Sequence, residues 1–338
     1  MKNVFSALLA ALMLAGMLAG CMNSSEVPMG SATAAPSQTE APAHTKISIV
    51  TTIFPEYDWV REILGDKADS AEITMLLDNG VDLHSYQPTA DDLIKISDCD
   101  LFVYVDGESD GWVEDALKSA ANRDRKVINL LEILGDSVKE EETVEGMQAE
   151  EEDHEDHEEK EYDEHVWLSL KNAEVLVGVI SKSLQELDPG NKDTYAANAD
   201  AYVQKLSALD AEYQKAVSAG TYKTLLFGDR FPFRYLVDDY GLSYYAAFAG
   251  CSAESEASFE TVSFLAKKVD EGKLPCVLTI EGKNHKIAET IVQNTAGKNQ
   301  KILTMDSMQS TTSQDVANGT TYLSLMAKNL DVLKEALG

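Results

Sequence analysis

Positively charged residues are scarce in this sequence. It contains 28 Lys and Arg against 58 Asp and Glu in 338 residues, which gives a formal net charge of −30. The imbalance argues against a nucleic-acid partner, because an acidic surface repels phosphates and the sequence has no basic stripe. An acidic surface gathers cations instead, although solubility alone is the plainer explanation of surface acids.

Cysteine is also rare, with four residues in the whole sequence. Cys21 ends a targeting signal, which leaves Cys99, Cys251 and Cys276 for the rest of the chain. An odd number excludes a complete disulfide framework. Cys99 and Cys276 begin apolar runs, so we expect them to be small buried residues. A bridge between Cys251 and Cys276 stays open as the less favoured alternative.

Long hydrophobic runs are limited to one, at residues 4–19. This run is too short for a stable membrane span, and it ends in LAGC at residues 18–21. Small residues directly before a cysteine are typical of a bacterial lipoprotein signal. We therefore expect residues 1–20 to be a signal peptide, Cys21 to carry lipid, and residues 21–45 to form a flexible tether. The protein would then be an extracytoplasmic lipoprotein anchored in a membrane.

Strand and helix patterns alternate along the rest of the chain. KISIVTTI, EITMLL, LFVYV and KVINL are typical of strands, as are TLLFGD, SYYAAFAG, CVLTIE and KILTMD after the acidic segment. This alternation predicts an α/β fold of two Rossmann-like lobes, each a parallel sheet of about four strands flanked by helices. We expect the lobes at residues 46–190 and 220–338, joined by one long rigid helix within residues 191–219.

Several potential metal ligands follow predicted strands. In the first lobe these are Asp82 and His84, after EITMLL. In the second lobe they end three of the strand patterns and are Asp229, Glu281 and Asp306. Parallel sheets bind ligands outside the carboxyl ends of their strands. Two facing lobes would therefore hold a cation in the cleft between them.

Six segments occur in a dense and definite order. They are TTIFPEYDWVREILGDKA, LLDNGVDLHSYQPTADDLIKISDCDLFVYVDG, DEHVWLSLKNAEVLVGVISKSLQELDPGN, YAANADAYVQKLSALDAEY, FRYLVDDYGL and KILTMDSM. In this order, behind a lipoprotein signal, they resemble the substrate-binding lipoproteins of ABC transporters for zinc and manganese. The resemblance covers about residues 47–337. It implies a two-lobed fold with the metal cleft between the lobes and a rigid connecting helix.

The resemblance also implies which residues bind the metal. The family's first ligand histidine lies in a D-x-H-x-x-x-P motif, which residues 82–88 match with His84. The second lies in an H-x-W-L motif, matched by His165 and the residues after it. The last ligand is an Asp after the final strand, which corresponds to Asp306.

The third ligand is where the sequence departs from the family pattern. The family has His or Glu ten residues before the Tyr of a Tyr-Gly-Leu, and here that position holds Arg230. An arginine is always charged and cannot bind a cation. Three alternatives stay open. Asp229 could turn inward, or His285 could reach in. Alternatively, Arg230 could pair with Glu281 or with the last ligand, and water would complete the site. Asp229 or water is the favoured choice.

The segment at residues 139–164 is strongly acidic. Residues 140–164 contain 15 Asp and Glu and one Lys, together with His154 and His157. Its low apolar content predicts a disordered loop, for which a solvated run of charge is the usual interpretation. Similar loops in the zinc-directed members of the family favour a weak metal-collecting role.

The expected function is capture of a divalent metal ion and its delivery to an ABC permease in the cytoplasmic membrane. Imidazole ligands suit Zn²⁺, whereas carboxylate and water suit Mn²⁺, so zinc is favoured and manganese is the alternative cargo. We expect a monomer without enzymatic activity. A secreted zinc-dependent hydrolase is disfavoured because no HExxH motif is present. A surface adhesin is a further alternative that the sequence neither supports nor excludes.

Overall fold

The computed structural model describes residues 46–148, 161–252, 256–282 and 284–338. The expected signal peptide, the lipidated Cys21 and the tether lie outside the described residues, as do His154 and His157. No helix in the described ranges combines the length and the apolar character that a membrane crossing requires.

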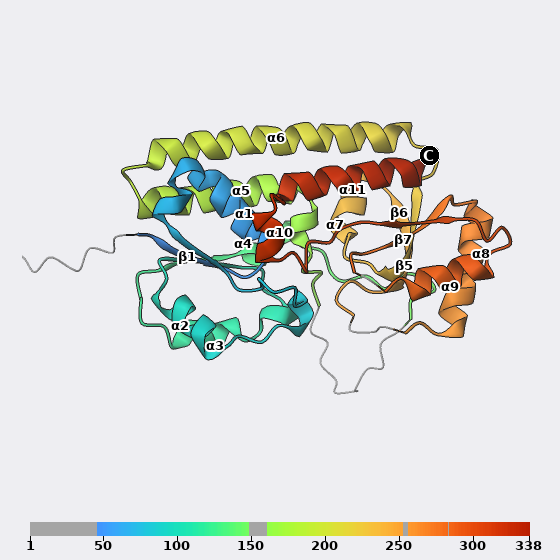
Figure 1. Cartoon of the computed structure of the whole chain (residues 1–338), viewed down its shortest axis with the longest axis horizontal. Helices are drawn as coiled ribbons and strands as arrows, with labels where there is room; N and C mark the ends of the chain where they lie inside the picture. Colours follow the sequence, from blue (N-terminus) through green and yellow to red (C-terminus); the bar gives the residue numbers. More distant parts are fainter. Residues whose placement is uncertain (1–45, 149–160, 253–255, 283) are drawn as a thin grey trace, which may run out of the picture. The chain divides into compact units, whose positions relative to one another are not determined.

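Two parallel four-stranded sheets form the framework (Figure 1). The first has the order β2-β1-β3-β4, and its strands are β1 (Ser48–Thr51), β2 (Glu72–Met75), β3 (Leu101–Tyr104) and β4 (Lys126–Asn129). The second has the order β6-β5-β7-β8, and its strands are β5 (Thr224–Arg230), β6 (Ser243–Phe248), β7 (Cys276–Thr279) and β8 (Lys301–Thr304). The prediction of two parallel sheets of four strands is confirmed.

Helices cover the sheets, which explains why β3 and β7 are continuous apolar runs buried along their whole length. The α-helices are α1 (Phe54–Leu64), α2 (Ala90–Asp98), α3 (Val113–Lys118), α4 (Leu130–Leu134), α5 (Leu170–Leu187), α6 (Lys192–Ala219), α7 (Arg234–Tyr240), α8 (Phe259–Gly272), α9 (Lys286–Asn294), α10 (Ser313–Ala317) and α11 (Tyr322–Leu337). Short 3₁₀ turns that matter for the site are η2 (Leu83–Ser85), η3 (Glu108–Asp110) and η5 (Val166–Leu168).

Helix α6 connects the two sheets over 28 residues. It packs against α5, α1 and α11, and Figure 1 shows it lying along α5 and α11. Its buried face includes Tyr202, Leu206 and Tyr213, and the Tyr213 hydroxyl donates to the carbonyl oxygen of Met326 in α11 at 2.7 Å. One continuous apolar core runs from the first sheet to the second and includes α11.

The acidic segment is more ordered than the sequence predicts. Its described ends pair with each other, because the amide of Glu141 donates to the carbonyl of Glu161 at 3.0 Å and that of Asp163 to the carbonyl of Lys139 at 2.9 Å. The amide of Gln148 donates to the carbonyl of Ala247 in β6 at 2.9 Å. The expectation of a disordered loop over residues 139–164 is therefore wrong for the described part, since backbone hydrogen bonds fix both ends.

Candidate metal centre

His84 stands in the turn η2, after the carboxyl end of β2. The turn forms because the Asp82 carboxylate accepts a hydrogen bond from the His84 amide at 3.1 Å, a local bond that favours turns over regular structure. The Nδ1 atom of His84 lies 2.8 Å from the Ser109 hydroxyl in η3. This contact leaves Nε2 as the ring atom that faces the cleft between the sheets.

His165 lies directly before η5 and is completely buried. One oxygen of Asp163 accepts the His165 amide at 2.9 Å and also lies 2.9 Å from Nδ1 of the ring. The indole of Trp167 packs against the ring, and its Nε1 donates to the carbonyl of Ser307 in the second lobe at 2.9 Å. The ring is therefore fixed by its own segment and by a contact across the molecule.

The two histidines meet at their Nε2 atoms, which are 3.3 Å apart. Two nitrogen ligands about 2.0–2.1 Å from a tetrahedral zinc ion are separated by about 3.3–3.4 Å. The Nδ1 atoms are occupied by Ser109 and Asp163, and such partners on the far nitrogen orient histidines that bind metals. The spacing and the orientation of the rings both suit one zinc ion between the Nε2 atoms.

The two histidines have opposite protonation tendencies. Burial, followed by the neighbouring His165, lowers the pKa of His84 to about 3. Burial also opposes the charge on His165, but Asp163 and Glu164 outweigh it and raise the pKa of His165 above its ordinary value. Near neutral pH, His84 is therefore a neutral donor, and a proton competes with the metal chiefly at His165.

A third donor, Cys251, joins the two histidines. The ligand atoms of His84, His165 and Cys251 all lie within 4.8 Å of one another, and in the described ranges no other set of three His, Cys, Asp or Glu does so. The three described cysteines are free, so the alternative of a Cys251–Cys276 bridge is wrong. Sequence analysis did not single out Cys251 as a candidate ligand, although it follows the carboxyl end of β6, where parallel sheets place ligands.

The other candidate ligands lie outside this group of three. Asp229 is tied to its own sheet, because its carboxylate accepts the Arg230 amide at 2.9 Å and the Ile280 amide at 3.3 Å. Asp306 accepts the amide of Met308 at 2.9 Å. Its pKa is raised to about 6 by burial and by the charge of Glu281. His285 immediately precedes α9. The ligand roles of Asp229, Asp306 and His285 stay predictions.

Glu281 holds the chain that follows Asp306. Its carboxylate accepts both the amide and the hydroxyl of Ser307, each at 2.7 Å. Because Trp167 donates to the carbonyl of the same serine, this chain is fastened to the segment that carries His165. Glu281 thus positions the neighbourhood of Asp306 through hydrogen bonds.

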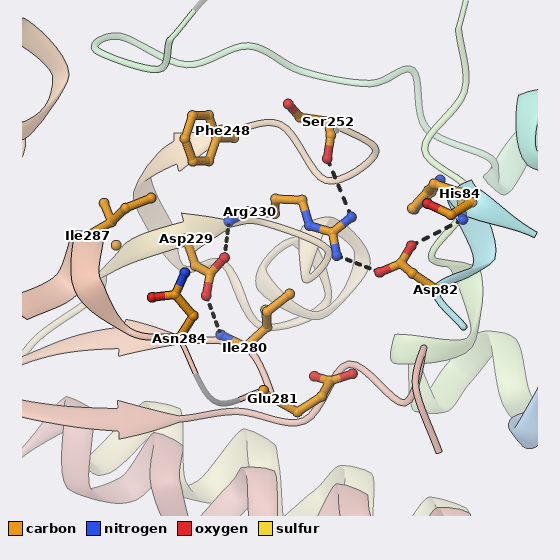
Figure 2. Close-up of a pocket in the computed structure, with 13 residues that line it drawn as sticks. Asp82, His84, Asp229, Arg230, Phe248, Ser252, Ile280, Glu281, Asn284 and Ile287 are labelled. Carbon is orange, nitrogen blue, oxygen red and sulfur yellow. Dashed lines mark hydrogen bonds and ion pairs between the residues drawn. The ribbon is translucent and has the colours of Figure 1, made fainter. Parts of the chain in front are cut away.

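Arg230 pairs with a residue that sequence analysis did not anticipate. Its Nη2 atom lies 2.5 Å from the Asp82 carboxylate in the first lobe, and its Nη1 donates to the carbonyl of Ser252 at 3.4 Å. Figure 2 shows the guanidinium between these two partners. The alternative that pairs Arg230 with Glu281 or Asp306 is therefore not the pairing in the structure, where Asp82 takes this place. Arg230 lines a cavity of about 400 Å³ together with Asp82 and His84.

Asp163→Asn is expected to weaken zinc binding about 10–100-fold, the usual cost of losing a partner that orients a metal-binding histidine. The amide has no negative charge to hold the Nδ1 proton, so the Nε2 lone pair is less available to the metal. Competition titration with a zinc chelator measures the effect. Asp188→Asn, at the end of α5, is a matched control and is expected to bind zinc normally. An unchanged affinity in Asp163→Asn would show that the buried carboxylate does not orient His165.

Comparison with known proteins identifies relatives over nearly the whole described chain. A family model described as zinc-uptake complex component A, periplasmic (ZnuA), matches residues 49–336. The zinc-binding lipoprotein AdcA of Streptococcus pneumoniae serotype 4 is 32% identical over 297 residues, which cover 87% of this chain and 56% of AdcA. The high-affinity zinc uptake system protein ZnuA of Bacillus subtilis is 32% identical over 86% of this chain and 88% of its own length.

A solved structure has the same fold. The Zn(II)-bound ZnuA-like domain of Streptococcus pneumoniae AdcA superposes with a TM-score of 0.67 at 30% identity, over 86% of this chain and 99% of that domain. This chain spans about half the length of the streptococcal AdcA proteins that it matches, at 56%. The similarity therefore concerns their ZnuA-like part.

Proposed function

Because the chain belongs to the ZnuA family of zinc-uptake components, we propose that it is the substrate-binding receptor of an ABC transporter and that its cargo is Zn²⁺. The receptor captures the ion between its two lobes and delivers it to a permease in the membrane. The observation that carries the proposal is the 3.3 Å separation of the Nε2 atoms of His84 and His165. Both rings are held in this position through their Nδ1 atoms.

Zinc is favoured over manganese because the three donors that meet are two imidazoles and a thiol. Nitrogen and sulfur ligands suit Zn²⁺, whereas Mn²⁺ prefers carboxylate and water. The family consists of receptors for transport, and we propose that this chain likewise has no enzymatic activity. In this proposal the residues at the site hold the ion and carry out no chemical reaction.

The place of the protein in the cell follows from the N-terminal sequence. We propose that lipid on Cys21 anchors it outside the cytoplasm and that the tether to residue 45 carries the receptor above the membrane. The receptor works as a monomer in this proposal. His154 and His157 then provide weak sites that raise the local concentration of zinc near the cleft.

Metal binding to the full chain, purified in detergent and stripped of metal, tests the proposed function. Titration with zinc and manganese in competition should find one tight zinc equivalent, with weaker equivalents that disappear when residues 149–160 are deleted. Tight binding of manganese with little preference for zinc would instead support manganese as the cargo. A chain without any tight site would retain the family's fold without its function.

Zinc affinity should fall with decreasing pH in a definite way. Above the raised pKa of His165 the ring is neutral and no proton on it competes with the metal. As the pH falls through that pKa, a proton on the ring begins to compete with the metal. His84, with a pKa of about 3, stays neutral over the same range. Below the pKa of His165, each further drop of one pH unit should therefore raise the Kd for zinc by an additional factor of about ten. An additional factor of about one hundred per pH unit between pH 7 and pH 5 would show that protons compete with the metal at both rings.

A further inference from the structure

The loop after β6 brings a thiol to the two histidines. Cys251 lies three residues beyond the end of this strand, on the lobe opposite to His84 and His165. Its sulfur lies within 4.8 Å of a ring nitrogen of each histidine. The two lobes therefore contribute to one set of donors, two nitrogens from the first and one sulfur from the second.

Gly250 permits the close approach of this loop. A β-carbon at this position would lie 2.9 Å from the carbonyl oxygen of Phe231 and 3.1 Å from Cε1 of His165. Neither neighbour can move easily, because one is backbone and the other is a completely buried ring. The bare backbone of Gly250 thus lies against the imidazole and places the next residue at the site.

Two further contacts hold the loop in position. The amide of Cys251 donates to the Glu141 carboxylate of the acidic segment at 3.1 Å. The carbonyl of Ser252 accepts from the Arg230 guanidinium at 3.4 Å. Arg230, which occupies the position of the family's third ligand, therefore supports the residue next to Cys251 and pairs with Asp82 at the same time.

We propose that the Cys251 sulfur is the third zinc ligand of this receptor and replaces the His or Glu that Arg230 has displaced. The inference rests on the proposed function and names the donor that completes its site. On binding, a zinc–sulfur bond forms and the thiol proton leaves to solvent, so the bound sulfur is a thiolate. Asp306 or a water molecule takes the fourth position.

The distances permit this coordination with a small adjustment. A zinc–sulfur bond of about 2.3 Å places sulfur about 3.5–3.6 Å from each nitrogen ligand. The Cys251 sulfur lies within 4.8 Å of a ring nitrogen of each histidine, so the three donors can reach one zinc ion after a shift on the order of 1 Å. A rotation of the cysteine side chain provides a displacement of this size.

A thiolate ligand changes which metals the receptor accepts. Soft sulfur donors select zinc and disfavour manganese, which prefers carboxylate and water. A site of two imidazoles and one thiolate should therefore discriminate against Mn²⁺ more strongly than a site in which a carboxylate takes the third position. Cys251 thus determines specificity in addition to binding.

Cobalt substitution tests the inference directly. The full chain is loaded with Co²⁺, and a thiolate ligand is expected to produce an intense sulfur-to-cobalt charge-transfer band in the near ultraviolet. Cys251→Ser should abolish the band and reduce the preference for zinc over manganese by at least tenfold. Cys99→Ser is the matched control, because Cys99 is buried at the C-terminal end of α2 and donates to the carbonyl of Ile96, away from the site. It should retain the band.

Alkylation of the wild-type chain gives a second measurement that does not depend on the folding of a variant. Zinc should protect Cys251 from iodoacetamide, as measured by mass spectrometry of its peptide. Stoichiometric cobalt without a charge-transfer band, or equal alkylation with and without zinc, would overturn the assignment of Cys251. Tight zinc binding in that same preparation would leave the proposed function intact. Absence of tight zinc binding in the wild type would instead overturn both.

Discussion

His165→Ala is expected to weaken zinc binding by more than the 10–100-fold that removal of an orienting partner costs. The substitution removes one of the two nitrogens that lie 3.3 Å apart, and water must replace it. It also leaves the buried Asp163 carboxylate without the Nδ1–H group that donates to it, which adds a penalty to the metal-free and the metal-bound protein alike. His84→Ala should lose affinity to a similar degree. Competition with a zinc chelator measures both constants.

Two controls separate the tight site from the rest of the molecule. Deletion of residues 149–160 should leave the tight equivalent nearly intact, because the histidines of that segment provide only weak sites. His285→Ala should also bind zinc normally, since its imidazole lies outside the group formed by His84, His165 and Cys251. If the deletion abolished tight binding while His165→Ala preserved it, the assignment of the site would be wrong.

Gly250→Ala is expected to impair zinc binding and to destabilise the protein by about 1–3 kcal/mol, the typical cost of forcing an extra methyl group into a packed region. The added methyl would stand 2.9 Å from a backbone carbonyl, so the loop must shift away from His165. Because the same loop carries Cys251, a shift of the backbone separates the sulfur from the ring nitrogens. Thermal unfolding with and without zinc measures both effects on one sample.

Gly178→Ala is the matched control for this prediction. Gly178 lies inside α5, and a β-carbon there would meet no atom within 4 Å. Alanine is the better helix former by about 1 kcal/mol, so this variant should be slightly more stable than the wild type and bind zinc normally. Equal zinc affinity in both glycine variants would show that the close approach of the loop to His165 is not required for binding.

The sheet architecture could be predicted from the sequence because each strand carries its own signal. Each of the eight apolar runs that the alternating pattern selects overlaps a strand of the structure. The helix predicted at residues 193–217 is part of α6, at Lys192–Ala219. Apolar periodicity is local information, and burial by the neighbouring helices reinforces it here.

The partners within the site could be predicted only in part. His84 and His165 stand in motifs with recognisable flanking residues, and the structure brings their rings together. Cys251 has no such motif, and its approach depends on Gly250, Glu141 and Arg230, which are distant from one another in the sequence. Contacts of this kind arise from tertiary packing and leave no periodic pattern.

The acidic segment shows how composition can mislead. Its low apolar content predicts disorder, yet Val144 and Met147 pack against the core. Glu141 lies beside the loop after β6, and its carboxylate accepts a hydrogen bond from the amide of Cys251. A few placed residues are sufficient to order the ends of a segment whose average composition is that of a loop.

The packing of α11 against α1 and α6 determines when the receptor can finish folding. The amide of Tyr322, at the start of α11, donates to the buried carboxylate of Asp58 in α1, and its hydroxyl donates to the carbonyl of Trp167, two residues from His165. A chain that emerges N-terminal end first leaves these groups of the first lobe uncovered until residues 322–337 arrive. Complete packing of the segment that carries His165 therefore requires both ends of the described chain, although the residues that face the metal all precede α11.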